Sequence, residues 1–143
     1  MTESAATTPP ADMSTFAVLV GRWEFSGEVT GDAQFDWLPG GHFLQQRGAL
    51  TREGVTHQAV EIIGAEKPFG ATEAATQITS RAYTDSGDTL DYTYELDGDA
   101  LTVWGGPKGS PAFSRARFNT DRTELRGAWQ WPGGGYRFTM TKR

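Results

Sequence analysis

The chain has 143 residues, of which 37% are hydrophobic and 22% charged, a size and composition typical of one water-soluble domain with a single core. Its net charge of −5 argues against a nucleic-acid partner, because phosphate binding needs a basic face. The absence of cysteine excludes disulfides, cysteine nucleophiles and thiolate metal sites, and no stretch approaches the roughly 18 apolar residues of a membrane span. No membrane partner is expected, and a cytoplasmic location is the default.

The first twelve residues are small, polar and proline-containing, and they lack the basic start and apolar centre of a secretory signal. We expect residues 1–12 to form a disordered tail ahead of a single domain that spans 13–143. Ser14 is expected to cap a short helical turn, "STFAVLVG", that Gly21 ends. The clustered apolar residues of this turn favour a lid against one end of a barrel.

From Arg22 onward, apolar and polar residues alternate with a period of two, and turn sequences such as Asp-Gly and Pro-Gly-Gly separate the alternating segments. Ten strands are predicted, and after the first, residues 22–29, they are "AQFDWL", "HFLQQRGAL", "VTHQAVEIIG", "TQITSRAY", "TLDYTYEL", "ALTVWG", "AFSRARFN", "ELRGAWQW" and "YRFTMTKR". Because no convincing helix lies between them, the sheet should be antiparallel. A closed up-and-down barrel removes the exposed edges and is the predicted all-β fold, with a two-sheet sandwich as the alternative.

The triplet Gly21-Arg22-Trp23 follows the helical turn and opens the first strand. With "FDWLPGGHFLQQ" and "VEIIGAE", it resembles the calycin superfamily, which includes lipocalins, fatty-acid-binding proteins and nitrobindin-like barrels. The resemblance is strongest to a group of small bacterial lipocalin-like proteins and spans residues 14–143. It implies that Trp23 closes one end of the barrel beneath a basic side chain, for which Arg137, Lys142 and Arg143 are the candidates.

The two histidines bear on whether the barrel holds haem or a metal. Nitrobindin-like barrels hold haem through a histidine near the C-terminus, whereas His42 and His57 both lie in the first half of this chain. A catalytic zinc site needs a third protein ligand, and Glu61 lies about 13 Å from His57 if both occupy one strand. Neither haem nor a metal is therefore expected, and no other cofactor is indicated.

Alternation predicts which side chains face the interior. If the Pro39-Gly40-Gly41 turn makes a tight hairpin, Trp37 lies opposite Leu44, and Phe35 lies opposite Gln46. The predicted ligand-binding residues are Phe35, Trp37, Leu44, Gln46, Tyr92, Tyr94 and Arg117. A ring-lined cavity with a few polar groups predicts the binding of a small hydrophobic or aromatic molecule, with Gln46 and the tyrosine hydroxyls fixing its orientation.

A barrel enzyme is the first alternative, such as a cyclase, isomerase or dehydratase that acts on a hydrophobic substrate. Its acid/base pair would be His57 and Glu61, with Tyr92 or Tyr94 as the proton donor, since desolvation moves Glu and His pKa values toward neutrality. No nucleophile elbow or other complete catalytic set is present in the sequence, so binding without catalysis is favoured.

A non-catalytic module that forms a homodimer is the second alternative. Some predicted strands are apolar on both faces, which leaves outward residues such as Leu38, Phe43 and Val60 available for contact with another chain.

Overall fold

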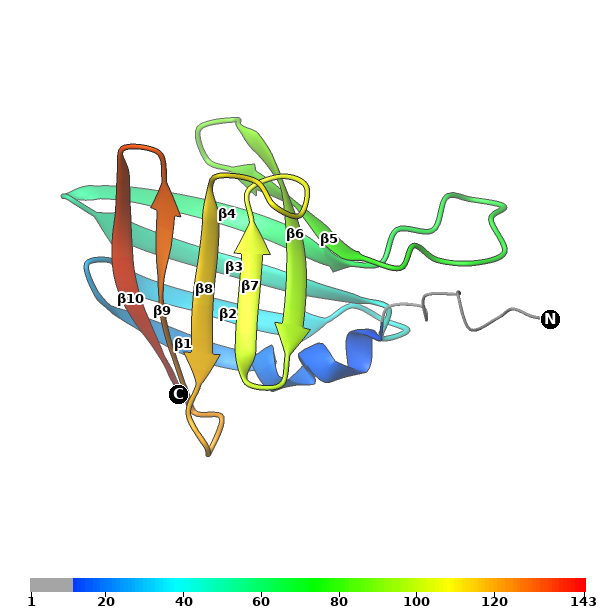
Figure 1. Ribbon diagram of the computed structural model, residues 1–143, viewed down its shortest axis with the longest axis horizontal. Coiled ribbons are helices and arrows are strands. Elements are labelled where there is room, and N and C mark those ends of the chain that lie inside the picture. The colour runs from blue at the N-terminus through cyan, green and yellow to red at the C-terminus, as the bar shows by residue number, and fades with distance from the viewer. Residues whose placement is uncertain (1–11) are drawn as a thin grey trace.

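The computed structural model describes residues 12–143, which form a closed barrel of ten antiparallel strands with one short 3-10 helix across an end (Figure 1). The predicted all-β up-and-down barrel is confirmed, and the sheet is closed rather than split into the two layers of a sandwich. The expected disordered tail lies outside the described residues, except for Asp12.

Each strand pairs with the next along the chain, and pairing of the first with the last closes the sheet. The strands are β1 (Gly21–Gly27), β2 (Thr30–Trp37), β3 (Phe43–Arg52), β4 (Val55–Gly64), β5 (Ile78–Thr84), β6 (Thr89–Asp97), β7 (Ala100–Trp104), β8 (Phe113–Phe118), β9 (Glu124–Trp131) and β10 (Gly134–Lys142). The predicted register of the β2–β3 hairpin is confirmed, since Trp37 pairs with Leu44 and Phe35 pairs with Gln46.

The 3-10 helix η2 (Met13–Leu19) closes the end of the barrel at which the β6–β7 and β8–β9 turns lie (Figure 1). Asp12 is its N-cap, because its side chain accepts a hydrogen bond from the backbone N–H of Ser14; the prediction of Ser14 as the cap was wrong by two residues. Asp and Ser are about equally good N-cap residues, and here Ser14 donates its hydroxyl to the same Asp12 oxygen. Phe16 and Leu19 are buried against the barrel.

Trp23 fills the centre of this closed end. It has no exposed surface, and its Nε1 donates a hydrogen bond to the carbonyl oxygen of Leu19 at 2.8 Å. The Nζ of Lys142 lies 5.5 Å from its ring centroid, so Lys142 is the basic residue that the sequence left among three candidates. The ring therefore ties η2, the first strand and the last strand together.

The segment between β7 and β8, residues 105–112, folds over the outside of β6 and β7. Thr93 lies on the outward face of β6 and is nevertheless buried under this segment, where its hydroxyl donates to the carbonyl oxygen of Gly106 at 2.7 Å. Trp104 is buried on the same outer face, and Lys108 lies 5.7 Å from its ring centroid. Some side chains on the outer face of this barrel are therefore covered by a loop and not exposed to solvent.

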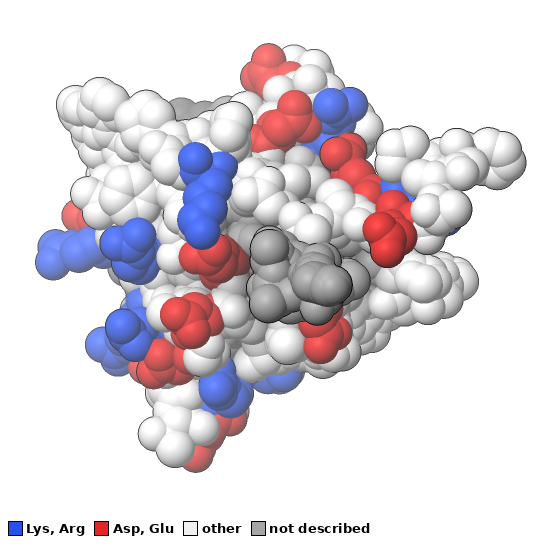
Figure 2. Space-filling view, turned by 45° about the vertical axis from the view of Figure 1, so that its right-hand side comes forward, with Lys and Arg blue, Asp and Glu red and all other residues white. Residues whose placement is uncertain are grey.

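On the face of the molecule that Figure 2 shows, Lys and Arg side chains are interspersed among Asp and Glu. The exposed pair Arg81–Asp91 links β5 to β6, and the exposed pair Arg117–Asp99 links β8 to the β6–β7 turn. Solvent screens both pairs, so each contributes little to stability. Within residues 12–143, no helix has the length and apolar character that crossing a bilayer requires.

Candidate functional site

The barrel encloses a cavity of about 350 Å³, a volume within the usual range of small-molecule sites. Most of its lining is apolar. Eight aromatic residues contribute: Phe25, Phe35, Tyr92, Tyr94, Trp129, Trp131, Tyr136 and Phe138. The remaining apolar lining is Leu19, Leu50, Leu101, Val103, Ala116, Leu125 and Met140, and the polar lining is Gln46, Glu61 and Ser114.

The cavity runs from the closed end, where Leu19 of η2 contributes, toward the opposite end, where the β3–β4 and β9–β10 turns lie. At that opposite end the rings of Trp131 and Tyr136 meet edge to face, with centroids 6.1 Å apart. The guanidinium of Arg52 lies 5.5 Å from the Trp131 centroid and 5.1 Å from the Tyr136 centroid. These half-buried residues form the rim of the barrel at that end.

Glu61 is the buried charged group of the cavity, and its residue surface is only 7% exposed. Its Oε2 accepts two hydrogen bonds, from the Ser80 hydroxyl at 2.5 Å and from the Tyr94 hydroxyl at 2.6 Å. Burial raises the pKa of Glu61 above its ordinary value of 4.5, although the hydrogen bonds from Ser80 and Tyr94 act in the opposite direction. Adjacent strands place these groups together, because Glu61 lies on β4, Ser80 on β5 and Tyr94 on β6.

The two tyrosines on β6 remain neutral proton donors over the ordinary pH range. Burial, followed by the neighbouring charge of Glu61, raises the pKa of Tyr92 to about 12. The same two causes raise the pKa of Tyr94 well above its ordinary value of 10, and its hydrogen bond to Glu61 adds to the effect. Tyr92 stacks edge to face on Trp129 with centroids 5.9 Å apart, which orients its ring in the cavity.

Four of the seven predicted ligand-binding residues line the cavity, namely Phe35, Gln46, Tyr92 and Tyr94. Trp37 and Leu44 share the inner face with Phe35 and Gln46, but they form one ladder pair that lies two positions nearer the closed end, where both pack against the core. The structure therefore brings the four together around one space and leaves the other two beneath it.

Arg117 does not face the cavity, contrary to the sequence interpretation, and His57 is not among the residues that line it. On β8 the inner face carries Ser114 and Ala116, so Arg117 points outward and donates a hydrogen bond to Asp99 at 2.7 Å. His57 pairs with Leu50 and lies on the same side of β4 as Glu61, but it is four residues nearer the β3–β4 turn, where it is exposed. The acid/base pair of His57 and Glu61 is thus not assembled, whereas Glu61, Tyr92 and Tyr94 of the enzyme alternative share the cavity.

Sequence reasoning missed the contribution of the last two strands. Trp129 and Trp131 on β9, and Tyr136 and Phe138 on β10, line the cavity. Their spacing of two residues is the signal that marks an inner face, in "ELRGAWQW" as in "YRFTMTKR". Ser80 was also missed, since a lone serine on a strand gives no sign that it donates to a buried carboxylate.

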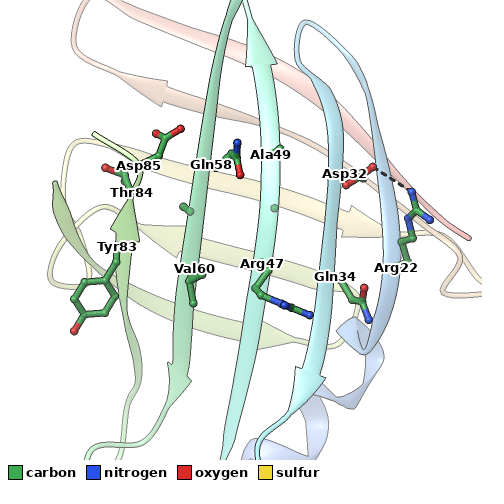
Figure 3. Close-up of a pocket in the computed structure, with 12 residues that line it drawn as sticks. Arg22, Asp32, Gln34, Arg47, Ala49, Gln58, Val60, Tyr83, Thr84 and Asp85 are labelled. Carbon is green, nitrogen blue, oxygen red and sulfur yellow. Dashed lines mark hydrogen bonds and ion pairs between the residues drawn. The ribbon is translucent and has the colours of Figure 1, made fainter. Parts of the chain in front are cut away.

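A larger depression, of about 570 Å³, lies on the outside of the barrel across β1 to β5 (Figure 3). Its side chains are mostly polar or charged, and Arg22 and Asp32 pair with each other at 3.3 Å rather than facing a ligand. Small residues such as Ala49 on β3 create the hollow between longer neighbours (Figure 3). Because it offers little apolar surface to bury, the interior cavity is the better candidate site.

No protein-family model matches the chain, and no curated protein matches it in sequence. Among residues 12–143, no three His, Asp or Glu side chains gather as a metal site would require. The function must therefore be argued from the cavity.

Proposed function

We propose that this protein binds a small, largely apolar or aromatic molecule inside its barrel. The observation that carries the proposal is the ring-lined cavity of about 350 Å³, closed at one end by η2 and Trp23. Apolar burial supplies most of the affinity at about 25 cal/mol per Å² before the costs of association, and Gln46, Glu61 and Tyr92 supply the orientation.

We also propose that the fold is lipocalin-like, within the calycin group. Support comes from the position of Trp23 after a short helix, under the ammonium group of Lys142 from the last strand. In such a barrel the binding function lies in the cavity, and the closed end provides stability.

A substitution that fills the cavity tests the binding proposal. Ala116 lines the cavity from β8, and Ala116→Phe places a ring in the space that the ligand would occupy. We expect the affinity for a neutral apolar dye, N-phenyl-1-naphthylamine, to fall at least about tenfold, as measured by dye fluorescence. Native mass spectrometry of the purified wild-type protein should in parallel detect a co-purified small molecule.

Ala49→Phe is the matched control, because it makes the same change on the outer face of β3 (Figure 3). It should leave dye binding close to that of the wild type. An equal loss of dye affinity in both variants would contradict the assignment of the cavity as the binding site. So would an Ala116→Phe variant that is folded, as judged by circular dichroism, and binds the dye as tightly as the wild type.

A further inference from the structure

Within the part of the chain that the structure describes, only one of the two Glu61 carboxylate oxygens accepts a hydrogen bond. Both hydrogen bonds from other described residues go to Oε2, and within residues 12–143 none goes to Oε1. Glu61 is more than nine-tenths buried and lines the cavity, so a ligand group is placed to meet this oxygen. A buried carboxylate with an unfilled acceptor is costly unless something satisfies it.

The only ionisable charge in the cavity lining is negative. Glu61 is the only residue among the cavity-lining set with an acidic or basic side chain, apart from the weakly acidic tyrosines Tyr92, Tyr94 and Tyr136. Arg52 lies at the rim, over the rings of Trp131 and Tyr136, rather than beside the carboxylate. A ligand carboxylate would therefore meet a like charge and no cation inside the barrel, whereas a ligand cation would meet an anion and several aromatic rings.

We propose that the ligand of this cavity is an apolar molecule that carries a protonated amine, with its ammonium group on Glu61 and its body among the rings. This inference rests on the proposed function and adds the chemical class of the ligand. The ammonium group donates to Oε1 while Ser80 and Tyr94 continue to donate to Oε2, so the carboxylate becomes fully satisfied. The hydroxyl of Tyr92 is not hydrogen-bonded to another described residue. Tyr92 is therefore available to contact the ammonium end of the ligand.

Amine binding is coupled to the protonation of Glu61. Burial raises the pKa of this carboxyl, and an ammonium group binds its ionised form, so amine affinity increases with pH until Glu61 has lost its proton. The other titratable groups that line the cavity, Tyr92, Tyr94 and Tyr136, have raised pKa values and stay neutral over this range. His57, on the same side of β4, and Arg52, at the rim, lie outside the lining set. An alcohol of the same shape should show no such increase.

Matched probes separate the amine class from apolar binding in general. We would measure calorimetric affinities for the amine, alcohol and carboxylic acid of each of several bodies, namely hexyl, octyl, decyl and naphthylmethyl, at about pH 8. The amines are protonated there because a primary alkylamine resembles lysine, with a pKa of about 10.4. We expect each amine to bind at least about tenfold more tightly than its alcohol, and each acid to bind most weakly, as suits a charge-assisted hydrogen bond.

Glu61→Gln should bring the ratio of amine to alcohol affinity close to one, since the amide still accepts from Ser80 and Tyr94 but has no charge. Glu95→Gln is the control, because Glu95 lies on the outer face of β6, exposed and paired with Lys108, and should leave the ratio unchanged. If Glu61→Gln fails to fold, the pH dependence of amine affinity in the wild-type protein tests the proposal instead.

The outcomes distinguish the two proposals. Alcohols or acids that bind as tightly as amines, or an amine affinity that does not rise with pH, would overturn the amine assignment and leave the binding function standing. No measurable binding of any probe in the set would overturn the binding function itself.

Discussion

Glu61 is a buried acid held by two hydroxyl donors in a ring-lined cavity. Its raised pKa makes a prediction about stability as well as about ligands. The folded state retains the proton of Glu61 at pH values where the unfolded chain, with a carboxyl pKa near 4.5, has already lost it. Folding stability therefore decreases as pH rises from about 4.5 through the folded pKa, and changes no further from this group above it.

Replacing Glu61 by Gln removes this dependence. We expect the free energy of unfolding of Glu61→Gln, relative to the wild type, to increase steadily with pH over that window, as measured by urea denaturation at a series of pH values. Glu95→Gln, which removes a charge from the exposed face of β6, should show the pH slope of the wild type. A Glu61→Gln difference that stays constant with pH would show that the carboxyl titrates alike in both states.

Single residues were predictable from the sequence only where their strand carried a clear alternation. Tyr92 and Tyr94 alternate with polar residues on β6, and both line the cavity. On β8 each face carries one Phe, with Arg on one side and Ser and Ala on the other, so the pattern alone does not choose the inner face. The space available inside the barrel decides the orientation: the small residue Ala116 faces inward opposite Gly127 of β9, and Arg117 lies on the solvated side.

At the scale of the strand and the hairpin, the sequence predicts most of what the structure contains. Alternation and the Gly-containing turns placed ten strands in order, and the Pro39-Gly40-Gly41 turn predicted the β2–β3 register correctly. The cover that residues 105–112 provide for Thr93 and Trp104 was not predictable, because it depends on how a loop folds back in three dimensions. Local periodicity carries no information about such long-range cover.

Gly127 allows β8 and β9 to approach closely. A Cβ atom at this position would lie only 2.2 Å from the carbonyl oxygen of Arg115 and 2.5 Å from the Cβ of Ala116, and both of these are fixed by the strand pairing. Since backbone cannot yield as a flexible side chain can, we expect Gly127→Ala to lower the free energy of unfolding by about 1–3 kcal/mol in chemical denaturation.

Gly105→Ala is the matched control for this substitution. A Cβ at Gly105 would meet its nearest neighbours, both on Ala112, at 3.5 Å, which is ordinary contact. Its effect on the free energy of unfolding should be small, within about 0.5 kcal/mol. Equal effects of the two substitutions would mean that the strand pair relaxes to admit the methyl group.

At the scale of the whole molecule, closure of the sheet follows from the number of strands and the lack of helices between them. Ten hairpin-linked strands leave two edges unless the first and last strands pair, and here β1 pairs with β10 from Trp23–Lys142 to Gly27–Phe138. The cavity does not follow in the same way. Whether inward rings fill a barrel or leave space depends on its diameter and on the directions of side chains such as Trp129 and Tyr136, which alternation does not specify.

Because the barrel is closed, neither β1 nor β10 is an edge strand, and both have ladder partners on two sides. The closing ladder also continues to the last residue, whose backbone N–H donates to the carbonyl oxygen of Arg22 at 2.8 Å. We therefore expect the paired amides of β1 and β10 to exchange with deuterium as slowly as those of the long β3–β4 ladder, through the same global unfolding event. Exchange measured residue by residue by NMR would test this, with the exposed Glu53–Gly54 turn as the fast internal reference. Rapid exchange confined to β1 and β10 would instead indicate that the barrel opens between its first and last strands, and the cavity would then have a side entrance as well as its rim.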